Sequence, residues 1–262
     1  MGFRGRTFSI ALFSLLGCAS AERHPDALAR PESIDNETET TSLAREKSSP
    51  LKTIWQLGRK GRIVFTVHGI RGAPADLDPI HAKVAARSRE ISTFLYADEG
   101  VDLDEASEVL GQEIVERLGQ SPGSPPVEIY AHSMGARLAV SALMRQAEAL
   151  KGYSIRLTLI APMLGGSEQA VGAQSAFWPL NVVPAVQLAQ DMDPAGDFQR
   201  ALENFRPSPK LRAAILRGGQ DEIVPLNRAY RQVVRALNAP ERVLPGADHV
   251  SIIEQSLPHL GL

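Results

Sequence analysis

Residues 127–140 read VEIYAHSMGARLAV and pass from a β-branched and aromatic run into an Ala- and Leu-rich helical run. The letters AHSMG, with Ser133 at their centre, stand at the junction. A sharp turn from strand to helix at this point lifts a serine hydroxyl above a sheet and beside the N-terminus of a helix. The alternative is an ordinary loop in which Ser133 only caps the helix. Small residues two positions before and after the serine let the sharp turn close, so Ser133 is a candidate nucleophile.

A second stretch, GQSPG at 119–123, matches the expression Gly-x-Ser-x-Gly more literally, because Ala131 stands where Gly is usual in the first stretch. Ser121 follows a helical pattern and enters SPGSPP, with no strand pattern before it and no helical pattern after it. A cluster of Pro, Gly and Ser of this kind is typical of a solvent loop. We therefore prefer Ser133 to Ser121.

Apolar β-type runs alternate with helical segments along the rest of the chain. Strands are predicted at 63–67, 92–96, 127–131, 155–160, 211–216 and 241–244. Helices are predicted near 76–89, 102–118, 134–150 and 226–237, with apolar residues spaced three and four apart in ASEVLGQEIVERL. This alternation predicts an α/β fold with a mostly parallel sheet flanked by helices.

The interval 162–210 breaks this rhythm, because it is too long for a bare connection and mixes Gly, Pro and large apolar residues. Its apolar side chains Phe177, Trp178 and Leu180 indicate a packed insert. We expect this insert to form a cap or lid near the entrance of a substrate pocket. The alternative is that it forms extra helices that pack on the core.

Two later segments place a carboxylate and an imidazole directly after predicted strands. LRAAILRGGQDEIVP offers Asp221, and ERVLPGADHVSII offers His249. These segments resemble the patterns Gly-x-x-Asp-x-[Ile/Leu]-Val-Pro and Gly-[Ala/Cys]-x-His of the α/β-hydrolase superfamily, whose site residues occur in the chain order Ser, Asp or Glu, His. The resemblance covers about residue 62 to the C-terminus. It implies Ser133 as nucleophile, His249 as base and Asp221 as the acid that orients His249.

Each residue type is required by the chemistry. A serine alcohol is a poor nucleophile at neutral pH, so an imidazole must take its proton and later return it to the leaving group. A carboxylate fixes the tautomer of the imidazole. The rivals are Glu222 for the acid and His259 for the base, while Asp248 is interpreted as a turn residue.

The resemblance also implies an oxyanion hole made of two backbone N–H groups. The first belongs to Met134, the residue after the nucleophile. The second belongs to Ile70, the third residue of a His-Gly-x motif that follows the first predicted strand. His68 in this motif and His132 in the elbow are interpreted as structural histidines.

The stretches HGIRGAP, YADEGVDLDEASEVLGQEI and DMDPAGDFQRAL resemble segments of bacterial lipase-like and PGAP-type esterases, with Ala195 and Asp197 departing from the family pattern. The resemblance implies an esterase or lipase that acts on carboxylic esters with acyl chains. Thioesterase, acyltransferase or peptidase chemistry on the same triad is an alternative, since a fold does not determine a substrate. A catalytically silent scaffold is another. Arg137 is interpreted as a helix-surface arginine, with contact to an acidic headgroup as the alternative.

The composition limits the classes of partner and cofactor that can be expected. With 262 residues, 44% of them hydrophobic, and a formal net charge of −2, one main domain is expected and a nucleic-acid partner gains no electrostatic support. The sequence contains no His-Glu-x-x-His, P-loop or dinucleotide fingerprint, so no metal or organic cofactor is implied. The expected partners are a small-molecule or lipid ester and a membrane, and the oligomeric state stays open.

The first residues have the pattern of a secretory leader. Arg4 and Arg6 precede an apolar run at 8–16, too short to span a bilayer comfortably, and the run ends in LLGC. This ending resembles the bacterial lipobox, which implies cleavage before Cys18 and attachment of a diacylglycerol to its thiol. We expect a lipoprotein signal peptide at 1–17 and a lipidated Cys18, with an unmodified cysteine in an ordinary leader as the alternative.

The residues after Cys18 suggest a location and a tether. Ala19 and Ser20 stand where an aspartate would retain a lipoprotein at the inner membrane, so the resemblance to Gram-negative sorting favours a lipid-anchored position at the outer membrane of the cell envelope. Residues 18–52 are polar and punctuated by proline, which predicts a flexible tether. The α/β-hydrolase domain is expected at 53–262. Cys18 is the only cysteine, so an intramolecular disulfide is excluded.

Overall fold

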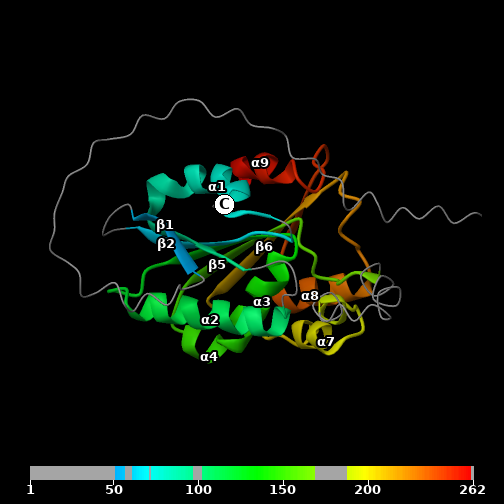
Figure 1. Ribbon diagram of the computed structural model, residues 1–262, viewed down its shortest axis with the longest axis horizontal. Coiled ribbons are helices and arrows are strands. Elements are labelled where there is room, and N and C mark those ends of the chain that lie inside the picture. The colour runs from blue at the N-terminus through cyan, green and yellow to red at the C-terminus, as the bar shows by residue number, and fades with distance from the viewer. Residues whose placement is uncertain (1–50, 57–60, 71, 97–101, 169–187, 261–262) are drawn as a thin grey trace, which may run out of the picture. The chain divides into compact units, whose positions relative to one another are not determined.

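The computed structural model describes residues 51–56, 61–70, 72–96, 102–168 and 188–260 (Figure 1). The predicted leader, Cys18 and nearly all of the predicted tether lie outside these residues, as do Phe177, Trp178 and Leu180 of the insert. Among the described ranges, no helix has the combination of length and apolar character that crossing a membrane requires.

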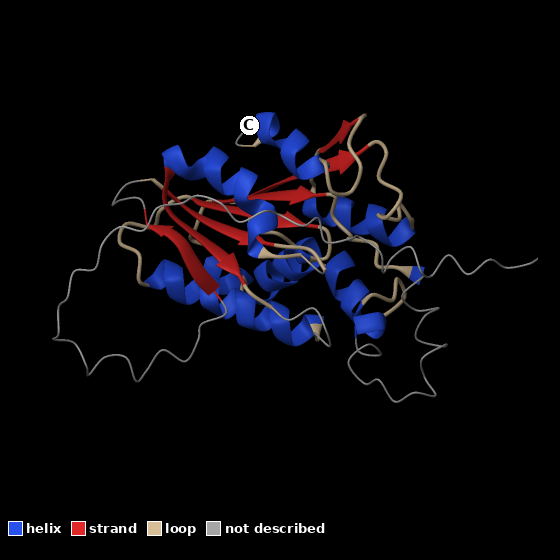
Figure 2. Ribbon diagram, turned by 45° about the horizontal axis from the view of Figure 1, so that its top comes forward, coloured by secondary structure: helices blue, strands red, loops and turns tan. Residues whose placement is uncertain are grey.

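The strands form a single sheet, drawn in red in Figure 2. They are β1 Leu51–Gln56, β2 Arg62–Val67, β3 Ser88–Phe94, β4 Val127–His132, β5 Ile155–Ile160, β6 Leu211–Gly218 and β7 Glu241–Leu244. Their order in the sheet is β1-β3-β2-β4-β5-β6-β7. All neighbours are parallel except β1, which runs antiparallel to β3. The predicted mostly parallel sheet is confirmed.

Helices cover both faces of this sheet. They are α1 Asp78–Val84, α2 Leu103–Gly119, α3 Gly135–Arg145, α4 Ala147–Leu150, α7 Asp197–Glu203, α8 Arg228–Leu237 and α9 Ile252–Ser256, with 3₁₀ turns η3 Pro74–Leu77, η4 Ala85–Arg87 and η6 Leu257–His259. Helices α1 and α9 lie on one face, and α2, α3, α4 and α8 lie on the other (Figures 1 and 2). Helix α7 belongs to the described part of the insert.

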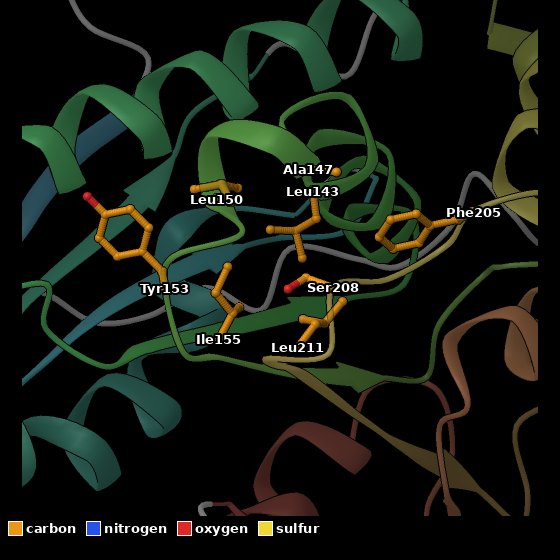
Figure 3. Close-up of a pocket in the computed structure, with 8 residues that line it drawn as sticks. All are labelled: Leu143, Ala147, Leu150, Tyr153, Ile155, Phe205, Ser208 and Leu211. Carbon is orange, nitrogen blue, oxygen red and sulfur yellow. The ribbon is translucent and has the colours of Figure 1, made fainter.

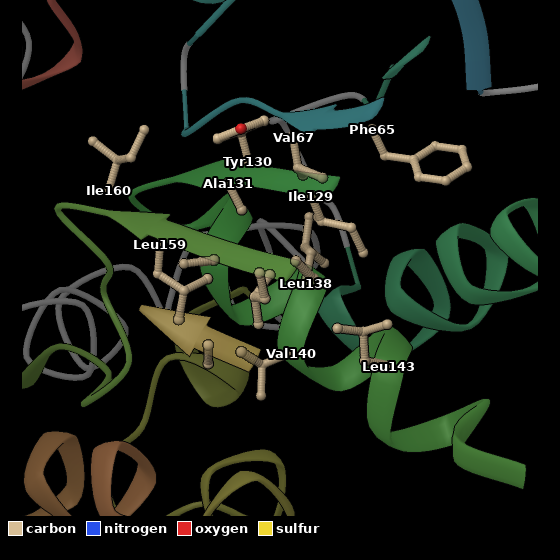
Figure 4. Packing of buried hydrophobic residues seen from close by; sticks show 14 of the residues in the cluster. Phe65, Val67, Ile129, Tyr130, Ala131, Leu138, Val140, Leu143, Leu159 and Ile160 are labelled. Carbon is tan, nitrogen blue, oxygen red and sulfur yellow. The ribbon is translucent and has the colours of Figure 1, made fainter. Parts of the chain in front are cut away.

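The central strands are long apolar runs because both faces of a helix-covered parallel sheet are buried. In β2, residues 63–67 are all buried, and so are residues 127–131 of β4. Figure 4 shows side chains of these strands and of β5 gathered against helix α3, which contributes Leu138, Val140 and Leu143 to the same buried cluster. The packed sheet gives the C-terminal ends of β4, β6 and β7 fixed positions along one edge.

Two strands differ from the sequence prediction: β1 was not predicted, and β3 begins earlier than predicted. In both, polar residues interrupt the apolar pattern. Strand β1 begins at Leu51, inside the stretch assigned to the tether, because an edge strand does not require a continuous apolar run. Strand β3 begins at Ser88 rather than at residue 92. The polar residues at its start are buried with partners, since Ser88 Oγ donates to the carbonyl of Val84 and Glu90 forms an ion pair with Arg117.

A small apolar pocket lies between α3, α4 and the sheet (Figure 3). Its lining includes Leu150, Tyr153, Ile155 and Leu211. Ile155 and Leu211 are the first residues of β5 and β6, so this pocket lies at the edge where the parallel strands begin. Ser133 follows the last residue of β4 at the opposite edge, and the pocket is therefore separate from the candidate site.

Candidate active site

Ser133 occupies a sharp turn between β4 and α3. Its φ of 54° lies in the left-handed region, which a non-glycine residue enters at a cost of about 1–3 kcal/mol. The Ser133 N–H donates to the carbonyl of Ile160 at 3.0 Å. The Ser133 carbonyl accepts from the N–H groups of Ala136 and Met163, both at 3.1 Å. The end of β5 and the residues after it thus hold the turn in its strained conformation.

Glycine is required two residues after the serine because the end of β2 passes very close to the turn. A Cβ placed on Gly135 would lie 2.3 Å from the carbonyl oxygen of His68 and 2.7 Å from that of Val67. The residue two before the serine is different: Ala131 is fully buried, and its methyl group is part of the core. The usual glycine at that position is therefore replaced without opening the turn.

Three side chains from three turns form one hydrogen-bonded chain. His249, in the turn after β7, has Nε2 at 2.9 Å from Ser133 Oγ and Nδ1 at 2.9 Å from Asp221 Oδ2. Asp221 lies in the turn after β6, and its side chain is 1% exposed while that of His249 is 12% exposed. The structure thus brings together the three residues that the sequence singled out.

The surroundings of Asp221 keep its carboxylate ionised. Burial alone would raise the pKa of Asp221, but the hydrogen bond and the electrostatic interaction with His249 outweigh it. Asp221 Oδ1 also accepts from the N–H groups of Ile223 at 2.9 Å and Val224 at 3.1 Å. The net result is a pKa of Asp221 below its ordinary value of 3.8. Because a carboxylate only accepts hydrogen bonds, His249 Nδ1 carries a proton, and Nε2 of the neutral ring is free to accept from Ser133.

The two residues expected to supply an oxyanion hole lie in the turn of Ser133 and in the loop next to it. Met134 follows Ser133 directly and is 1% exposed. A Cβ on Gly69 would lie 2.8 Å from Ser133 Cβ, so the loop that carries Ile70 contacts the serine. Within the described residues, neither the Met134 N–H nor the Ile70 N–H donates to a protein acceptor. Among these residues, no acceptor competes with a ligand oxygen for either group.

His132 supports the loop that carries His249. Its Nε2–H donates to the backbone carbonyl of His249 at 2.9 Å, and the two rings lie with centroids 5.0 Å apart. Burial, together with the nearby charge of His249, lowers the pKa of His132 to about 4. His132 is therefore neutral at neutral pH and holds the His249 loop as a hydrogen-bond donor.

His68 supports the loop next to Ser133 on the other side. Its ring stacks on Tyr96 at a centroid distance of 4.4 Å and an interplanar angle of 4°. Its Nδ1–H donates to the carbonyl of Gly69 at 2.8 Å, and the Tyr96 hydroxyl donates to the carbonyl of His68 at 2.7 Å. The side chain is thus occupied in fixing the loop, as expected for a structural histidine.

The rival residues lie elsewhere or have other partners. Ser121 Oγ donates to the carbonyl of Arg117 at the end of α2, and Ser121 precedes β4 whereas Ser133 follows it, so the two serines lie toward opposite ends of this strand. His259 Nδ1 accepts from Arg242 at 2.6 Å. Glu222 is exposed, and His249 pairs with the neighbouring Asp221 instead.

Asp248 behaves as the turn residue that the sequence indicated. Its Oδ1 accepts from the N–H groups of Val250 at 3.0 Å and Ser251 at 2.8 Å, and from the Ser251 hydroxyl. These hydrogen bonds fix the turn in which His249 projects toward Ser133.

Arg137 corrects the sequence interpretation, because it is fully buried rather than on a helix surface or at a headgroup site. Its guanidinium lies 5.0 Å from the ring centroid of Phe198 and donates to Gln199 Oε1 and to the carbonyls of Met163, Leu164 and Asp191. Burial, opposed by the charge of Asp191, lowers the pKa of Arg137 to about 10, so it stays charged at neutral pH. The sequence did contain a signal that Arg137 is buried. It stands in the stretch GARLAVSAL at 135–143, which has almost no other polar residue, and the structure buries this whole stretch in α3.

Arg137 joins the nucleophile turn to the described part of the insert. The same Met163 whose carbonyl faces Arg137 donates its N–H to the Ser133 carbonyl. Asp191 in turn accepts from the N–H of Leu103 at the start of α2. The insert residues at 188–205 are therefore fixed against α2 and α3, and residues 169–187 of the expected cap or lid lie outside the described residues.

The described residues contain no cluster of three or more His, Cys, Asp or Glu side chains placed to hold a metal ion. Their polar groups at the site are instead those of an acid, an imidazole and an alcohol.

Comparison with known proteins identifies the fold. No protein-family model and no curated protein matches the sequence. The type II thioesterase BorB from the borrelidin biosynthetic cluster is similar in structure, with a TM-score of 0.56, 20% identity and coverage of 80% of this chain and 93% of BorB. Est1E from Butyrivibrio proteoclasticus gives a TM-score of 0.56 and 13% identity over 80% of this chain and 90% of its own.

A third similar structure comes from work on LipS and LipT, two metagenome-derived lipolytic enzymes. It gives a TM-score of 0.55 and 14% identity, and it covers 81% of this chain and 97% of its own. These similarities show that the chain has the α/β-hydrolase fold. Since one fold supports many activities, the function is argued from the site.

Proposed function

We propose that this protein is a serine hydrolase that cleaves carboxylic esters through an acyl-Ser133 intermediate. The observation that carries the proposal is the hydrogen-bonded chain in which His249 lies 2.9 Å from both Ser133 Oγ and Asp221 Oδ2. Its nucleophile stands on a strained turn near the N–H groups of Met134 and Ile70, neither of which donates to an acceptor among the described residues. Nucleophile, base and orienting acid at these distances are the arrangement that acyl transfer requires.

In the first step, Ser133 Oγ attacks the ester carbonyl carbon while His249 Nε2 takes the hydroxyl proton. The carbonyl oxygen becomes an oxyanion, which accepts hydrogen bonds from the N–H groups of Met134 and Ile70. Asp221 stabilises the imidazolium that His249 becomes. Collapse of this intermediate breaks the ester C–O bond, and His249 returns the proton to the departing alkoxide. The acyl group remains on Ser133.

In the second step, His249 Nε2 removes a proton from water, which attacks the acyl-Ser133 carbonyl. The oxyanion again accepts from Met134 and Ile70, and its collapse releases the carboxylic acid while Ser133 recovers its proton from His249. No atom outside the ester, water and these residues takes part.

We further propose a location for this activity. The LLGC sequence supports lipidation of Cys18, and the residues after it support sorting to the outer membrane. An enzyme attached there meets esters that carry acyl chains, and one of the similar structures comes from work on lipolytic enzymes. Thioester cleavage is the second candidate, because BorB is a thioesterase and the same acyl-serine step serves both bonds.

The test measures kcat/KM on p-nitrophenyl butyrate, p-nitrophenyl palmitate and the corresponding butyryl thioester. Wild type is compared with Ser133→Ala and with Ser121→Ala, a matched serine-to-alanine control outside the site. We expect Ser133→Ala to lose about 10⁴-fold or more of the activity, while Ser121→Ala stays within about twofold of wild type.

The outcomes separate the candidates. A preference for the oxygen ester supports esterase or lipase activity, and the butyrate-to-palmitate ratio separates those two. A preference for the thioester supports the second candidate. Turnover that survives in Ser133→Ala contradicts the proposal, and absence of wild-type turnover on all three substrates supports the catalytically silent scaffold.

A further inference from the structure

Large apolar side chains that remain exposed gather at one edge of the sheet. In the described part of the chain they are Ile70, Leu95, Ile223, Leu226, Val250 and Val243, with exposures between 37% and 67%. All except Val243 lie in turns that follow the C-terminal ends of parallel strands, namely β2, β3, β6 and β7. Single exposed apolar residues are normal, but a group at one edge indicates a contact surface. We call Ile70, Leu95, Ile223, Leu226 and Val250 the apolar rim.

The apolar rim lies directly beside the catalytic chain. Val250 follows His249, and the N–H of Ile223 donates to Asp221. Ile70 follows Gly69, the residue whose Cβ would contact Ser133. Whatever covers the rim therefore also faces the nucleophile.

The N-terminal segment joins the domain at the same edge. Because β1 is antiparallel to β3, its first residue, Leu51, pairs with Phe94 at the C-terminal end of β3. Phe94 directly precedes Leu95 of the rim. The chain that leads back to Cys18 therefore joins the domain next to the rim, so a lipid at Cys18 would tether the domain at this edge.

Charges of both signs border the rim. The exposed carboxylates of Glu222 and Asp248 are next to rim residues in sequence, and the exposed Arg228 and Arg231 follow Leu226, whose carbonyl accepts from Arg231. The arginines that cluster in the described residues, Arg62, Arg87 and Arg156, surround Glu128 near the other end of the strands. A surface of this kind is suited to apolar contact without electrostatic assistance.

We propose that the apolar rim docks on the surface of a lipid bilayer and presents Ser133 to esters of membrane lipids. The inference rests on the proposed function. It specifies the substrate of the proposed ester hydrolysis as a lipid that stays in the bilayer. Docking places the mouth of the site against the acyl chains, so the substrate reaches Ser133 without crossing water.

The test uses the mature chain, residues 18–262, with Cys18→Ser so that binding reports the rim rather than the lipid anchor. Flotation with phosphatidylcholine vesicles measures the bound fraction of this protein and of a variant that also carries Leu95→Ser, Leu226→Ser and Val250→Ser. Val243→Ser is the matched control, because Val243 is 44% exposed but lies within β7. Val250→Ser alone, at a position 67% exposed, serves if the triple variant does not fold.

We expect the Cys18→Ser chain and its Val243→Ser control to float with the vesicles. The triple variant should lose about tenfold or more of its partition coefficient, and Val250→Ser alone a smaller part. Adding phosphatidylglycerol should change the binding less than about twofold. Turnover of dissolved p-nitrophenyl butyrate without vesicles should be equal in all variants, since none of the substituted residues is assigned to the catalytic chain.

Three results would overturn the inference: no flotation of the Cys18→Ser chain, equal flotation of the triple variant, or a dimer in sedimentation that only the triple variant loses. The last would assign the rim to a second copy of this chain. Failure of the proposed function is distinct, because it removes ester turnover and leaves flotation unchanged.

Discussion

Glu128 lies near the beginning of the parallel strands and Asp221 lies where they end, and the partners of these two buried carboxylates differ in kind. Near the beginning of the strands, Glu128 lies within 3.5 Å of Arg62, Arg87 and Arg156 and accepts from the Tyr130 hydroxyl at 2.8 Å. Where the strands end, Asp221 faces an imidazole that leads to a serine. The first carboxylate meets cations that keep their protons, and the second meets a group that can exchange one.

This difference separates a structural cluster from a reactive one. Arginine stays protonated in proteins, so Glu128 and its partners can fix the geometry but cannot move a proton. Histidine changes its charge near neutral pH, and Ser133 supplies the proton that it takes. Substitutions where the strands end should therefore change turnover, and substitutions where they begin should change stability.

The largest expected effect follows His249→Ala. Without its base, Ser133 keeps its proton, and kcat on p-nitrophenyl butyrate should fall by about 10⁴- to 10⁶-fold. The midpoint of thermal unfolding should change by only a few degrees, since the His249 side chain is not part of the core cluster. Turnover within tenfold of wild type would remove His249 from the mechanism.

The next effect follows Asp221→Asn, which keeps the size of the side chain. The amide no longer stabilises the imidazolium and permits the wrong tautomer of His249, so kcat should fall by about 10³- to 10⁴-fold. Glu222→Gln, one residue along the chain, is the control and should keep full activity. Equal losses in both variants would mean that Asp221 has no special role.

Asp221 also predicts a pH dependence of stability. Its pKa in the folded protein is below the ordinary value of 3.8, so its ionised form stabilises the fold. That contribution is complete above pH 3.8 and is lost as the pH falls through the folded-state value. The difference in unfolding free energy between wild type and Asp221→Asn should therefore be constant above about pH 5 and shrink below pH 4, as urea titrations would measure. A difference that grows on acidification would have the wrong sign.

Arg137→Met should destabilise the fold by about 3–5 kcal/mol, because it leaves buried carbonyls without their donor. Urea unfolding measures this loss, and Arg206→Met on the surface is the control. The folded fraction should keep KM and lose some kcat, since Met163 links Arg137 to the Ser133 carbonyl. Unchanged stability would contradict the structural role of the buried arginine.

The smallest effect on turnover is expected from Glu128→Gln. Removing the charge leaves three arginines close together, and stability should fall by about 1–3 kcal/mol. Turnover of the folded protein should stay within twofold of wild type. A large loss of kcat with intact folding would mean that the two ends of the strands are coupled, contrary to the comparison drawn above.

The fold and the candidate site could be predicted from the sequence because the site residues occur in a recognisable order, each after a predicted strand. Ser133, Asp221 and His249 each follow a run of apolar β-type residues, and such runs are easy to find because central parallel strands are buried on both faces. Each of the turns around them contains glycine, and at Gly135 and Gly218 a Cβ would lie within 2.5 Å of a neighbouring carbonyl oxygen. Gly135, for example, is required by the passage of β2 within 2.3 Å of its missing Cβ.

Features that depend on distant partners were not visible in the same way. Strand β1 is an edge strand with polar residues, and its pairing with β3 is set by the fold rather than by its own pattern. Arg137 looks like a surface residue until its partners at 163, 164, 191 and 199 are assembled around it. The spacing of apolar residues predicts which positions are buried in a helix or strand. It does not predict that a charged residue such as Arg137 will be buried by partners from distant parts of the chain.

Covalent labelling tests whether Ser133 is the nucleophile. Folded wild-type protein is treated with an alkyl phosphonate fluorophenyl ester, and the adduct is located by peptide mass spectrometry, with Ser133→Ala and His249→Ala treated in parallel. We expect one adduct, on Ser133, which is absent in Ser133→Ala and forms far more slowly in His249→Ala. Absence of an adduct on Ser133 in the folded wild type, or labelling of another serine at the same rate in all three proteins, would contradict it.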